Sequence, residues 1–327
     1  MSANASGNGR LAVVAFGGNA LITDNDHSAI PDQFHNVEAM APHVVDMIED
    51  GWRVLVTHGN GPQVGFILRR SELAMAEVAP VPMDYAVADT QGAIGYMFNK
   101  ALTNELRRRG LARPVATVVT QTLVDAADPA FVNPTKPVGA FMDEGSARRA
   151  AAELGWTVAE DAGRGWRRIV ASPRPRAIVE LDTIRSLLDT GVLVVACGGG
   201  GIPVTTNGQG ELAGIAAVID KDLASELLAR QLRADALIIP TGVEKVAIGF
   251  GTPQQQWLDR LTVSQAVAYA ESGQFGEGSM RPKVEALVGF VTANPAGAGV
   301  ITDAANLGRA LRRETGTWIE ADDRPAL

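Results

Sequence analysis

The sequence of 327 residues is poor in cysteine, since Cys197 is the only one it contains. A single thiol cannot form an intramolecular disulfide, and cysteine-rich zinc sites are excluded with it. The residues just before Cys197 are apolar, which favours a buried core thiol over a reactive one.

Long apolar runs are also missing. No stretch reaches the roughly 18 apolar residues that a membrane-spanning helix needs. Residues 1–10 are rich in Ser, Asn and Gly and lack the apolar centre of a signal peptide. We therefore expect a cytoplasmic protein that begins with a disordered arm over residues 1–10. The net charge of −8 disfavours nucleic acid or an anionic membrane as the main partner.

Short β-branched runs alternate with helical patterns along most of the chain. Strands are expected over residues 11–16, 54–57, 115–120, 192–197, 237–240 and 299–302, and helices over residues 33–50, 91–109, 181–188, 218–230, 282–292 and 307–313. This alternation predicts an α/β fold with a mostly parallel sheet covered on both faces. Ligands of such sheets bind beyond the carboxyl ends of the strands.

Residues 125–175 interrupt this rhythm. The segment carries five prolines and lacks a clear period, but it also contains Trp156 and Trp166. Because large aromatic side chains are usually buried, we expect an inserted subdomain here and not a linker.

Three of the expected strands end in glycine-rich loops. They are Gly17-Gly18-Asn19-Ala20, Thr57-His58-Gly59-Asn60-Gly61-Pro62-Gln63 and Gly198-Gly199-Gly200-Gly201. Glycine lets backbone N–H groups approach an anion closely, although the first loop alone fits a plain tight turn equally well. The third loop is not a P-loop, since no Gly-Lys-Ser/Thr follows it.

Three lysines occur in unusual contexts. Lys136 lies between two prolines, Lys221 between two aspartates, and Lys283 at an expected helix start, where the helix dipole disfavours a cation. Each one alone is more readily explained as an exposed surface charge. Together they suit phosphoryl transfer, in which catalysis consists mainly of positioning and charge stabilisation.

Seven motifs give the chain a specific resemblance to the carbamate kinases of the amino-acid-kinase superfamily, in family order from about residue 11 to 317. These motifs are Gly17-Gly18-Asn19-Ala20, Thr57-His58-Gly59-Asn60-Gly61-Pro62-Gln63-Val64-Gly65, Asn133-Pro134-Thr135-Lys136-Pro137, Gly165-Trp166-Arg167-Arg168, Cys197-Gly198-Gly199-Gly200-Gly201-Ile202-Pro203, Val218-Ile219-Asp220-Lys221-Asp222 and Gly278-Ser279-Met280-Arg281-Pro282-Lys283-Val284-Glu285.

The resemblance implies a three-layer α/β/α sandwich over residues 11–320, with residues 125–175 forming a small protruding subdomain that acts as a lid. It implies a homodimeric phosphotransferase that moves phosphate between carbamoyl phosphate and Mg-ADP, giving ATP and carbamate, which decays to ammonia and carbon dioxide. The family usually works in arginine or purine breakdown. Mg²⁺ would enter with ADP or ATP, and no protein residue is assigned as a metal ligand.

The resemblance also assigns roles to residues. Lys136 would reach the substrate phosphate from the lid, Lys221 and Lys283 would neutralise the transferring phosphoryl group, and Asp222 would orient the lysines. Substrate would bind at Gly17, Gly18, Asn19, Gly59, Asn60 and Gly61, and nucleotide at Gly199, Gly200, Thr241, Val243 and Lys283. Related kinases carry a lysine where this chain has Asn19, and Lys221 would replace that charge.

Two departures from the family pattern leave alternatives open. The nucleotide-side Thr-Asp-Val is Thr241-Gly242-Val243 here, and Ala216 replaces a glutamate. One alternative is a kinase of the same fold for another small acid. The other is a catalytically weak, ligand-binding relative. His58 is expected to be structural or to contact the phosphate loop, because an acceptor phosphate oxygen has no proton to lose.

Overall fold

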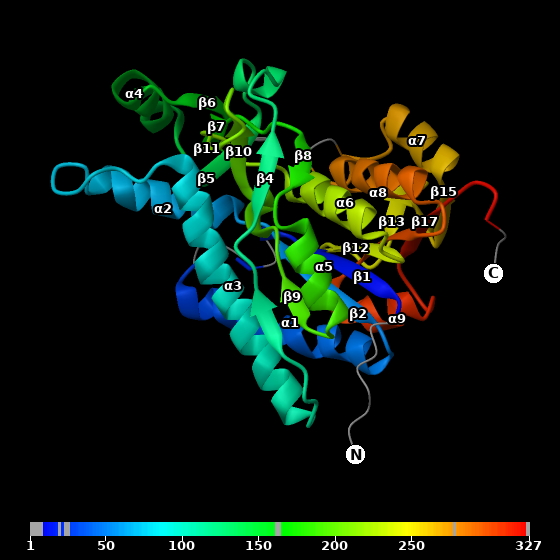
Figure 1. The fold of residues 1–327 in the computed structure, drawn as a ribbon. Coiled ribbons are helices and arrows are strands. Elements are labelled where there is room, and N and C mark those ends of the chain that lie inside the picture. Colours follow the sequence, from blue (N-terminus) through cyan, green and yellow to red (C-terminus); the bar gives the residue numbers. More distant parts are fainter. Residues whose placement is uncertain (1–8, 19–20, 23–26, 161–164, 277–278, 325–327) are drawn as a thin grey trace.

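An eight-stranded sheet forms the centre of the computed structural model, which describes residues 9–18, 21–22, 27–160, 165–276 and 279–324 (Figure 1). In spatial order its strands are β15 (Arg260–Thr262), β17 (Thr317–Glu320), β16 (Ala298–Thr302), β12 (Ala236–Pro240), β1 (Leu11–Phe16), β2 (Arg53–His58), β9 (Leu193–Val195) and β3 (Val115–Thr117). All neighbours pair in parallel except β16 and β17. The predicted mostly parallel sheet is therefore confirmed.

Helices cover both faces of this sheet, which confirms the predicted α/β class. One face carries α1 (Ile30–Glu49), α3 (Met83–Arg108) and α9 (Leu307–Leu311), and the other carries α5 (Leu181–Asp189), α6 (Lys221–Leu232), α7 (Val263–Glu271) and α8 (Arg281–Ala293). Side chains of a strand alternate between the two faces. Accordingly, Val14 and Phe16 of β1 join the core beneath α1 and α3, whereas Val13 and Ala15 join the core beneath α6 and α8.

Three smaller sheets surround the central one. The first contains β11 (Leu212–Gly214), β10 (Ile202–Thr206), β4 (Gln121–Val124) and β8 (Pro175–Ile178), and the second is the hairpin of β13 (Val246–Ile248) and β14 (Gln256–Leu258). The third contains β5 (Lys136–Met142), β7 (Trp166–Val170) and β6 (Thr157–Glu160), and α4 (Glu144–Leu154) packs on it.

This third sheet and α4 lie within residues 125–175, which we call the inserted segment. It projects at the top left of Figure 1, beyond the carboxyl ends of the central parallel strands. The helix α2 (Gly61–Leu73) packs directly against β5 and joins the segment to the body of the protein.

Several element boundaries differ from the sequence prediction. The helix expected over residues 218–230 begins only at Lys221, because Asp220 accepts hydrogen bonds from the N–H groups of Asp222 and Leu223 and so caps it. The strand expected over residues 115–120 is interrupted, since β3 ends at Thr117 and β4 starts at Gln121. The helix expected from residue 91 begins eight residues earlier, at Met83.

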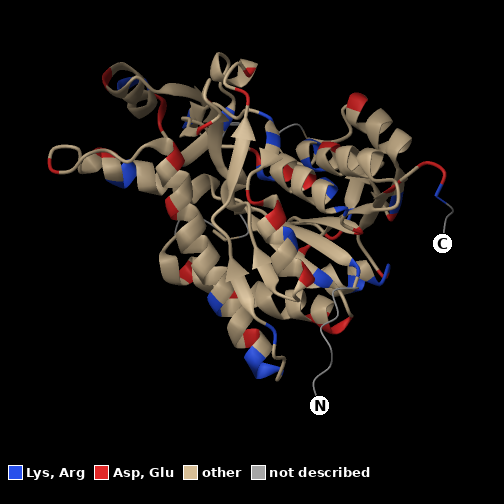
Figure 2. Ribbon diagram, in the orientation of Figure 1, with Lys and Arg blue, Asp and Glu red and all other residues tan. Residues whose placement is uncertain are grey.

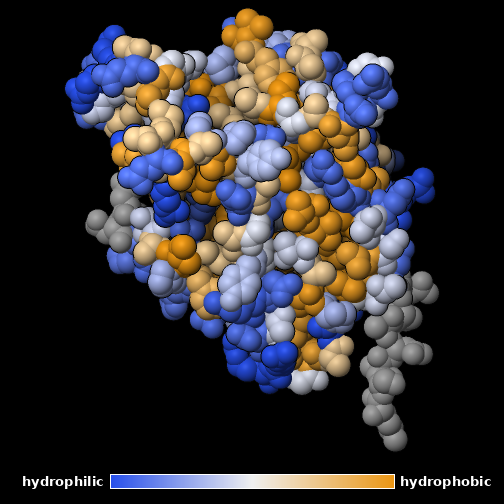
Figure 3. Space-filling model, turned by 60° about the vertical axis from the view of Figure 1, so that its left-hand side comes forward, coloured by the Kyte–Doolittle hydropathy of each residue, from blue (hydrophilic) through white to orange (hydrophobic). Residues whose placement is uncertain are grey.

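The surface matches the composition of the chain. Figure 2 shows acidic and basic residues interspersed along the ribbon. In Figure 3 apolar surface gathers in patches between hydrophilic areas. Tyr85 and Tyr96, both on α3, contribute to the apolar surface, because each is 64% exposed. Across the described ranges, no helix has both the length and the apolar character that crossing a membrane requires.

Candidate active site

The glycine loops after β1, β2 and β9 meet at one edge of the sheet, because these parallel strands all end there. The N–H of Gly59 donates to the carbonyl of Phe16 at 2.9 Å. A Cβ on Gly59 would lie 2.6 Å from the nitrogen of Gly18, and one on Gly199 would lie 2.1 Å from Nδ2 of Asn60. Real Cβ atoms do not come this close to other atoms. The loops can therefore be in contact only because Gly59 and Gly199 have no side chain.

The second loop leads directly into a helix. Asn60 is the N-cap of α2, and Gly61 is its first residue. The Asn60 side chain is buried and donates from Nδ2 to the hydroxyl of Thr90 at 2.8 Å, which fixes its orientation. The free N–H groups of a helix start attract anions. The structure therefore places Gly59, Asn60 and Gly61 where an anion would be bound, beside Gly18.

Left-handed backbone shapes the third loop. Cys197, Gly199, Gly200 and Gly201 all have positive φ, at 51°, 65°, 88° and 90°. Gln91 of α3 holds this loop in place, since its Nε2 donates to the carbonyls of Thr120 and Gly198. Gly199, predicted as a nucleotide ligand, lies beside the predicted substrate residue Asn60, whereas Gly200, the other predicted nucleotide ligand in this loop, faces Ile219.

Lys221 and Lys283 converge on one carboxylate. Both oxygens of Asp222 are used: Oδ1 accepts from Nζ of Lys221, and Oδ2 lies 3.2 Å from Nζ of Lys283. Lys221 also donates to the carbonyl of Ala15 at 3.2 Å, which ties it to the end of β1. The side chain of Lys221 is only 11% exposed, so reading this lysine as a surface charge is wrong.

Burial and neighbouring charges shift the pKa values of Lys221 and Asp222 in this cluster. Burial is the main reason that the pKa of Lys221 lies below its ordinary value; Asp222 opposes this change and Lys283 adds to it. Burial also acts to raise the pKa of Asp222, but the two lysines outweigh it and hold that pKa below its ordinary value. Two ammonium groups thus share one buried carboxylate, and the excess positive charge favours an anionic ligand.

The third lysine reaches the same helix start from the inserted segment. Nζ of Lys136, the first residue of β5, lies 2.5 Å from Oδ2 of Asp220. Burial acts to raise the pKa of Asp220, but Lys136 outweighs it and the pKa falls below its ordinary range. The three lysines therefore contact two aspartates on either side of Lys221, Asp220 and Asp222, at the start of α6.

The remaining predicted residues lie around this centre. Gly17 directly follows β1, whereas Asn19 lies outside the described residues. Thr241 and Val243 follow β12 on the other side of β1, and the N–H of Thr241 donates to the carbonyl of Thr302 on β16. They follow β12 at the same edge of the sheet.

His58 and Cys197 are buried near the loops. His58 stacks on Phe98 with ring centroids 5.9 Å apart, and burial lowers its pKa to about 4. Cys197 is 1% exposed and burial raises the pKa of its thiol, which confirms the predicted core thiol.

Sequence reasoning missed three supporting residues: Asp220, Thr90 and Gln91. Asp220 had a readable signal, because aspartate is favoured directly before the first turn of a helix. The two α3 residues had none, since their partners Asn60 and Gly198 are 30 and 107 positions away in the chain.

Comparison with known proteins identifies the family. The profile of the amino acid kinase family matches residues 10–296. Carbamate kinase from Thermococcus kodakarensis is 48% identical over 313 residues, which cover 95% of this chain and 99% of the relative. The chain belongs to the carbamate kinases of the amino acid kinase family.

Other carbamate kinases and their relatives agree with this. The carbamate kinase-like protein YahI of Escherichia coli is 48% identical, covering 94% of this chain and 98% of the relative. The structure of carbamate kinase from Giardia lamblia bound to AMP-PNP superimposes with a TM-score of 0.89 at 40% identity, covering 97% of this chain and all of that chain.

The crowded third loop predicts a sharp cost for a single methyl group. In Gly201→Ala the new Cβ would lie 1.9 Å from Oγ1 of Thr122, on a residue whose φ is +90°. We expect the free energy of unfolding to fall by about 2–5 kcal/mol, measured by urea denaturation. Gly242→Ala is the matched control, because its Cβ would meet nothing within 4 Å. Equal stability of the two variants would contradict the geometry described.

Burial of neutral His58 predicts a pH-dependent stability. Its folded pKa of about 4 lies below the ordinary 6.5, so between these values the unfolded chain binds more protons. Stability from this residue is complete above pH 6.5 and is lost as the pH falls to about 4, by about 3 kcal/mol in all. The free energy of unfolding of wild type, measured between these pH values, should therefore fall towards that of His58→Gln as the pH falls. Parallel curves would refute the assignment.

Proposed function

We propose that this carbamate kinase transfers a phosphoryl group reversibly between carbamoyl phosphate and ADP, forming ATP and carbamate. The observation that supports it most is the meeting of Lys136, Lys221 and Lys283 at the start of α6, beside the glycine loops. With Asp220 and Asp222 counted, these five charges sum to +1. A dianionic phosphoryl group is the kind of ligand that this excess charge would stabilise.

The geometry divides the task between backbone and side chains. N–H groups at the start of α2 and in the loop of Gly17 and Gly18 would hold the phosphate and carbamoyl oxygens. Lys221 and Lys283 would offset the charge that spreads over the transferring oxygens. Their fixed position on Asp222 means that little reorganisation is needed during the reaction.

General base catalysis has no place in this proposal. The acceptor is a phosphate oxygen of the nucleotide, which has no proton that must leave. His58 agrees with this, because its imidazole is buried, stacked on Phe98 and neutral near pH 7.

The nucleotide would lie towards β12 and α8. The Giardia relative binds AMP-PNP, and its fold superimposes on this one. Lys283 is the third residue of α8 and belongs to the cluster through its contact with Asp222. Gly199, Gly200, Thr241 and Val243 remain the proposed nucleotide contacts.

Mg²⁺ is proposed to enter with the nucleotide. Asp220 and Asp222 already have lysine partners, and the described residues hold no group of three or more His, Cys, Asp or Glu that could bind a metal. Phosphate oxygens and water would therefore supply most of its ligands, as is common for Mg²⁺. When bound, the ion would neutralise charge on the nucleotide phosphates.

Three broader assignments belong to the same proposal. The inserted segment is a lid over the phosphoryl donor, because it delivers Lys136 to the cluster. The protein is a cytoplasmic homodimer, and the exposed Tyr85 and Tyr96 are suitable interface residues. Its physiological setting is arginine or purine breakdown.

A coupled assay for ATP from carbamoyl phosphate and Mg-ADP tests the proposal. We expect turnover by wild type, and a loss of at least about 100-fold in kcat for Lys221→Ala, because a charge that stabilises the transition state is removed. Circular dichroism and thermal unfolding would show that the variant remains folded. Lys100→Ala is the control, since Lys100 lies over the ring of Phe34, away from the cluster, and should keep nearly full activity.

Two results would overturn the proposal. A Lys221→Ala variant with near-normal kcat would refute the role of this lysine. Folded wild-type protein that binds nucleotide but makes no ATP would instead favour a ligand-binding relative.

A further inference from the structure

The two carboxylate oxygens of Asp220 serve different parts of the molecule. Oδ1 accepts from the N–H groups of Asp222 at 2.8 Å and Leu223 at 3.3 Å, and so caps α6. Oδ2 accepts from Nζ of Lys136 at 2.5 Å. Asp220 thereby joins the helix that carries the catalytic cluster to a strand 84 residues away in sequence.

Lys136 keeps donors available in this arrangement. An ammonium group has three N–H donors, and the hydrogen bond to Oδ2 of Asp220 occupies one. Its side chain is 26% exposed, as is that of Asp220. The remaining N–H groups can therefore reach a phosphate oxygen without breaking the contact with Asp220.

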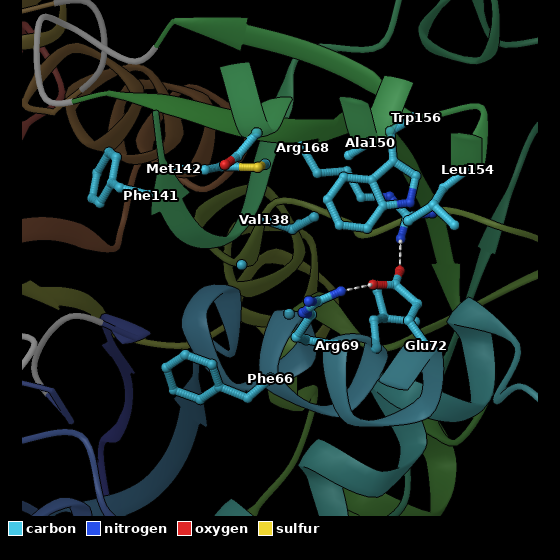
Figure 4. Close-up of a pocket in the computed structure, with 14 residues that line it drawn as sticks. Phe66, Arg69, Glu72, Val138, Phe141, Met142, Ala150, Leu154, Trp156 and Arg168 are labelled. Atoms are coloured by element: carbon cyan, nitrogen blue, oxygen red, sulfur yellow. Dashed lines mark hydrogen bonds and ion pairs between the residues drawn. The ribbon is translucent and has the colours of Figure 1, made fainter. Parts of the chain in front are cut away.

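A second set of contacts attaches the inserted segment to the body elsewhere. The backbones of Gly65 on α2 and Gly139 on β5 touch, since a Cβ on Gly65 would lie 2.0 Å from Cα of Gly139. Farther along, Nη1 of Arg168 on β7 lies 3.1 Å from Oε1 of Glu72 on α2. Figure 4 shows this ion pair at the edge of a cavity of about 290 Å³ between α2 and the segment.

The two ion pairs therefore have different positions. Arg168–Glu72 holds the segment onto α2 at the cavity, whereas Lys136–Asp220 lies at the first turn of α6, next to Lys221 and Asp222. In the proposed function, the second pair contains the lysine assigned to the transferring phosphate. The chain thus offers a natural comparison between anchoring the segment and placing its lysine.

We propose that Asp220 is a positioning residue. Its Oδ2, which takes no part in capping α6, holds Lys136 and the inserted segment in place over the reaction centre before substrate binds. This inference rests on the proposed function. A helix cap alone does not need a charge, because asparagine caps a helix about as well as aspartate. The charge of Asp220 acts most strongly on Lys136 and less strongly on Lys221.

Asp220→Asn separates these two tasks. The variant keeps a cap for α6 but loses the charge that attracts Lys136, so it should fold with a nearly unchanged melting temperature. We expect kcat/KM for carbamoyl phosphate to fall about 10- to 100-fold, with KM for ADP changed less than about twofold. In a Lys136→Met background the same substitution should cost less than about threefold, because its partner is already absent.

Amide hydrogen exchange gives a readout that does not depend on activity. In the ligand-free protein, Asp220→Asn and Lys136→Met should both speed exchange in β5 by about tenfold, while exchange in α6 stays unchanged. Glu72→Gln is the matched control, since it weakens the other ion pair. It should speed exchange in β7 but keep kcat/KM within about threefold of wild type.

Each outcome decides the matter. A normal kcat/KM in Asp220→Asn would mean that Asp220 only caps the helix. Losses that multiply independently with Lys136→Met would refute the proposal as well, because Asp220 would then act by another route, such as its charge on Lys221. An equal loss in Glu72→Gln would mean that general anchoring matters and not the placing of Lys136. If wild type shows no turnover, the proposed function fails. The exchange measurement still tests the contact between Asp220 and Lys136 by itself. Faster exchange in β5 of Asp220→Asn and Lys136→Met would support the contact, and unchanged exchange would refute it.

Discussion

The buried carboxylate of Asp222 is the constraint on which the rest of the site depends. Two ammonium groups held next to each other would repel strongly in a medium that water cannot screen. Asp222 offers one oxygen to each of Lys221 and Lys283, which fixes their spacing and opposes the lowering of the pKa of Lys221 by burial. One negative charge thus faces two positive ones, and in the proposed function this excess positive charge would bind the phosphoryl group. The carboxylate that stabilises the two lysines thus also leaves the excess positive charge on which the proposed function depends.

The cluster forms where strand ends, glycine loops and helix starts meet at one edge of the parallel sheet. Strands β1 and β2 end in loops that touch only because Gly18 and Gly59 lack side chains. Helices α6 and α8 bring their first turns, with the two lysines, from the same face of the sheet. Lysine at a helix start is unfavourable for the helix itself. The aspartates at the start of α6 offset this cost, so the two lysines can occupy positions that local structure disfavours.

Much of this arrangement could be predicted from the sequence. The apolar runs at residues 11–16 and 237–240 predicted β1 and β12, and their alternation with helices predicted the parallel sheet. The start of α6 was placed too early, because apolar Val218 and Ile219 continue the helical pattern while Asp220 ends it by capping. The strands of the inserted segment were missed, since their pairing at Lys136 and Val170 is non-local. The link from Lys136 to Asp220 is likewise tertiary, and no local pattern carries it.

The charge balance at Asp222 can be tested most directly by the pH dependence of Asp222→Asn. The substitution keeps the shape of the side chain but removes the negative charge that raises the pKa of Lys221. Turnover of carbamoyl phosphate with Mg-ADP would be followed between about pH 6 and 10 in both proteins. We predict that the alkaline limb of kcat/KM moves to lower pH by about one unit or more in the variant, because Lys221 loses its proton sooner. An alkaline limb at the same pH as in wild type would contradict the account.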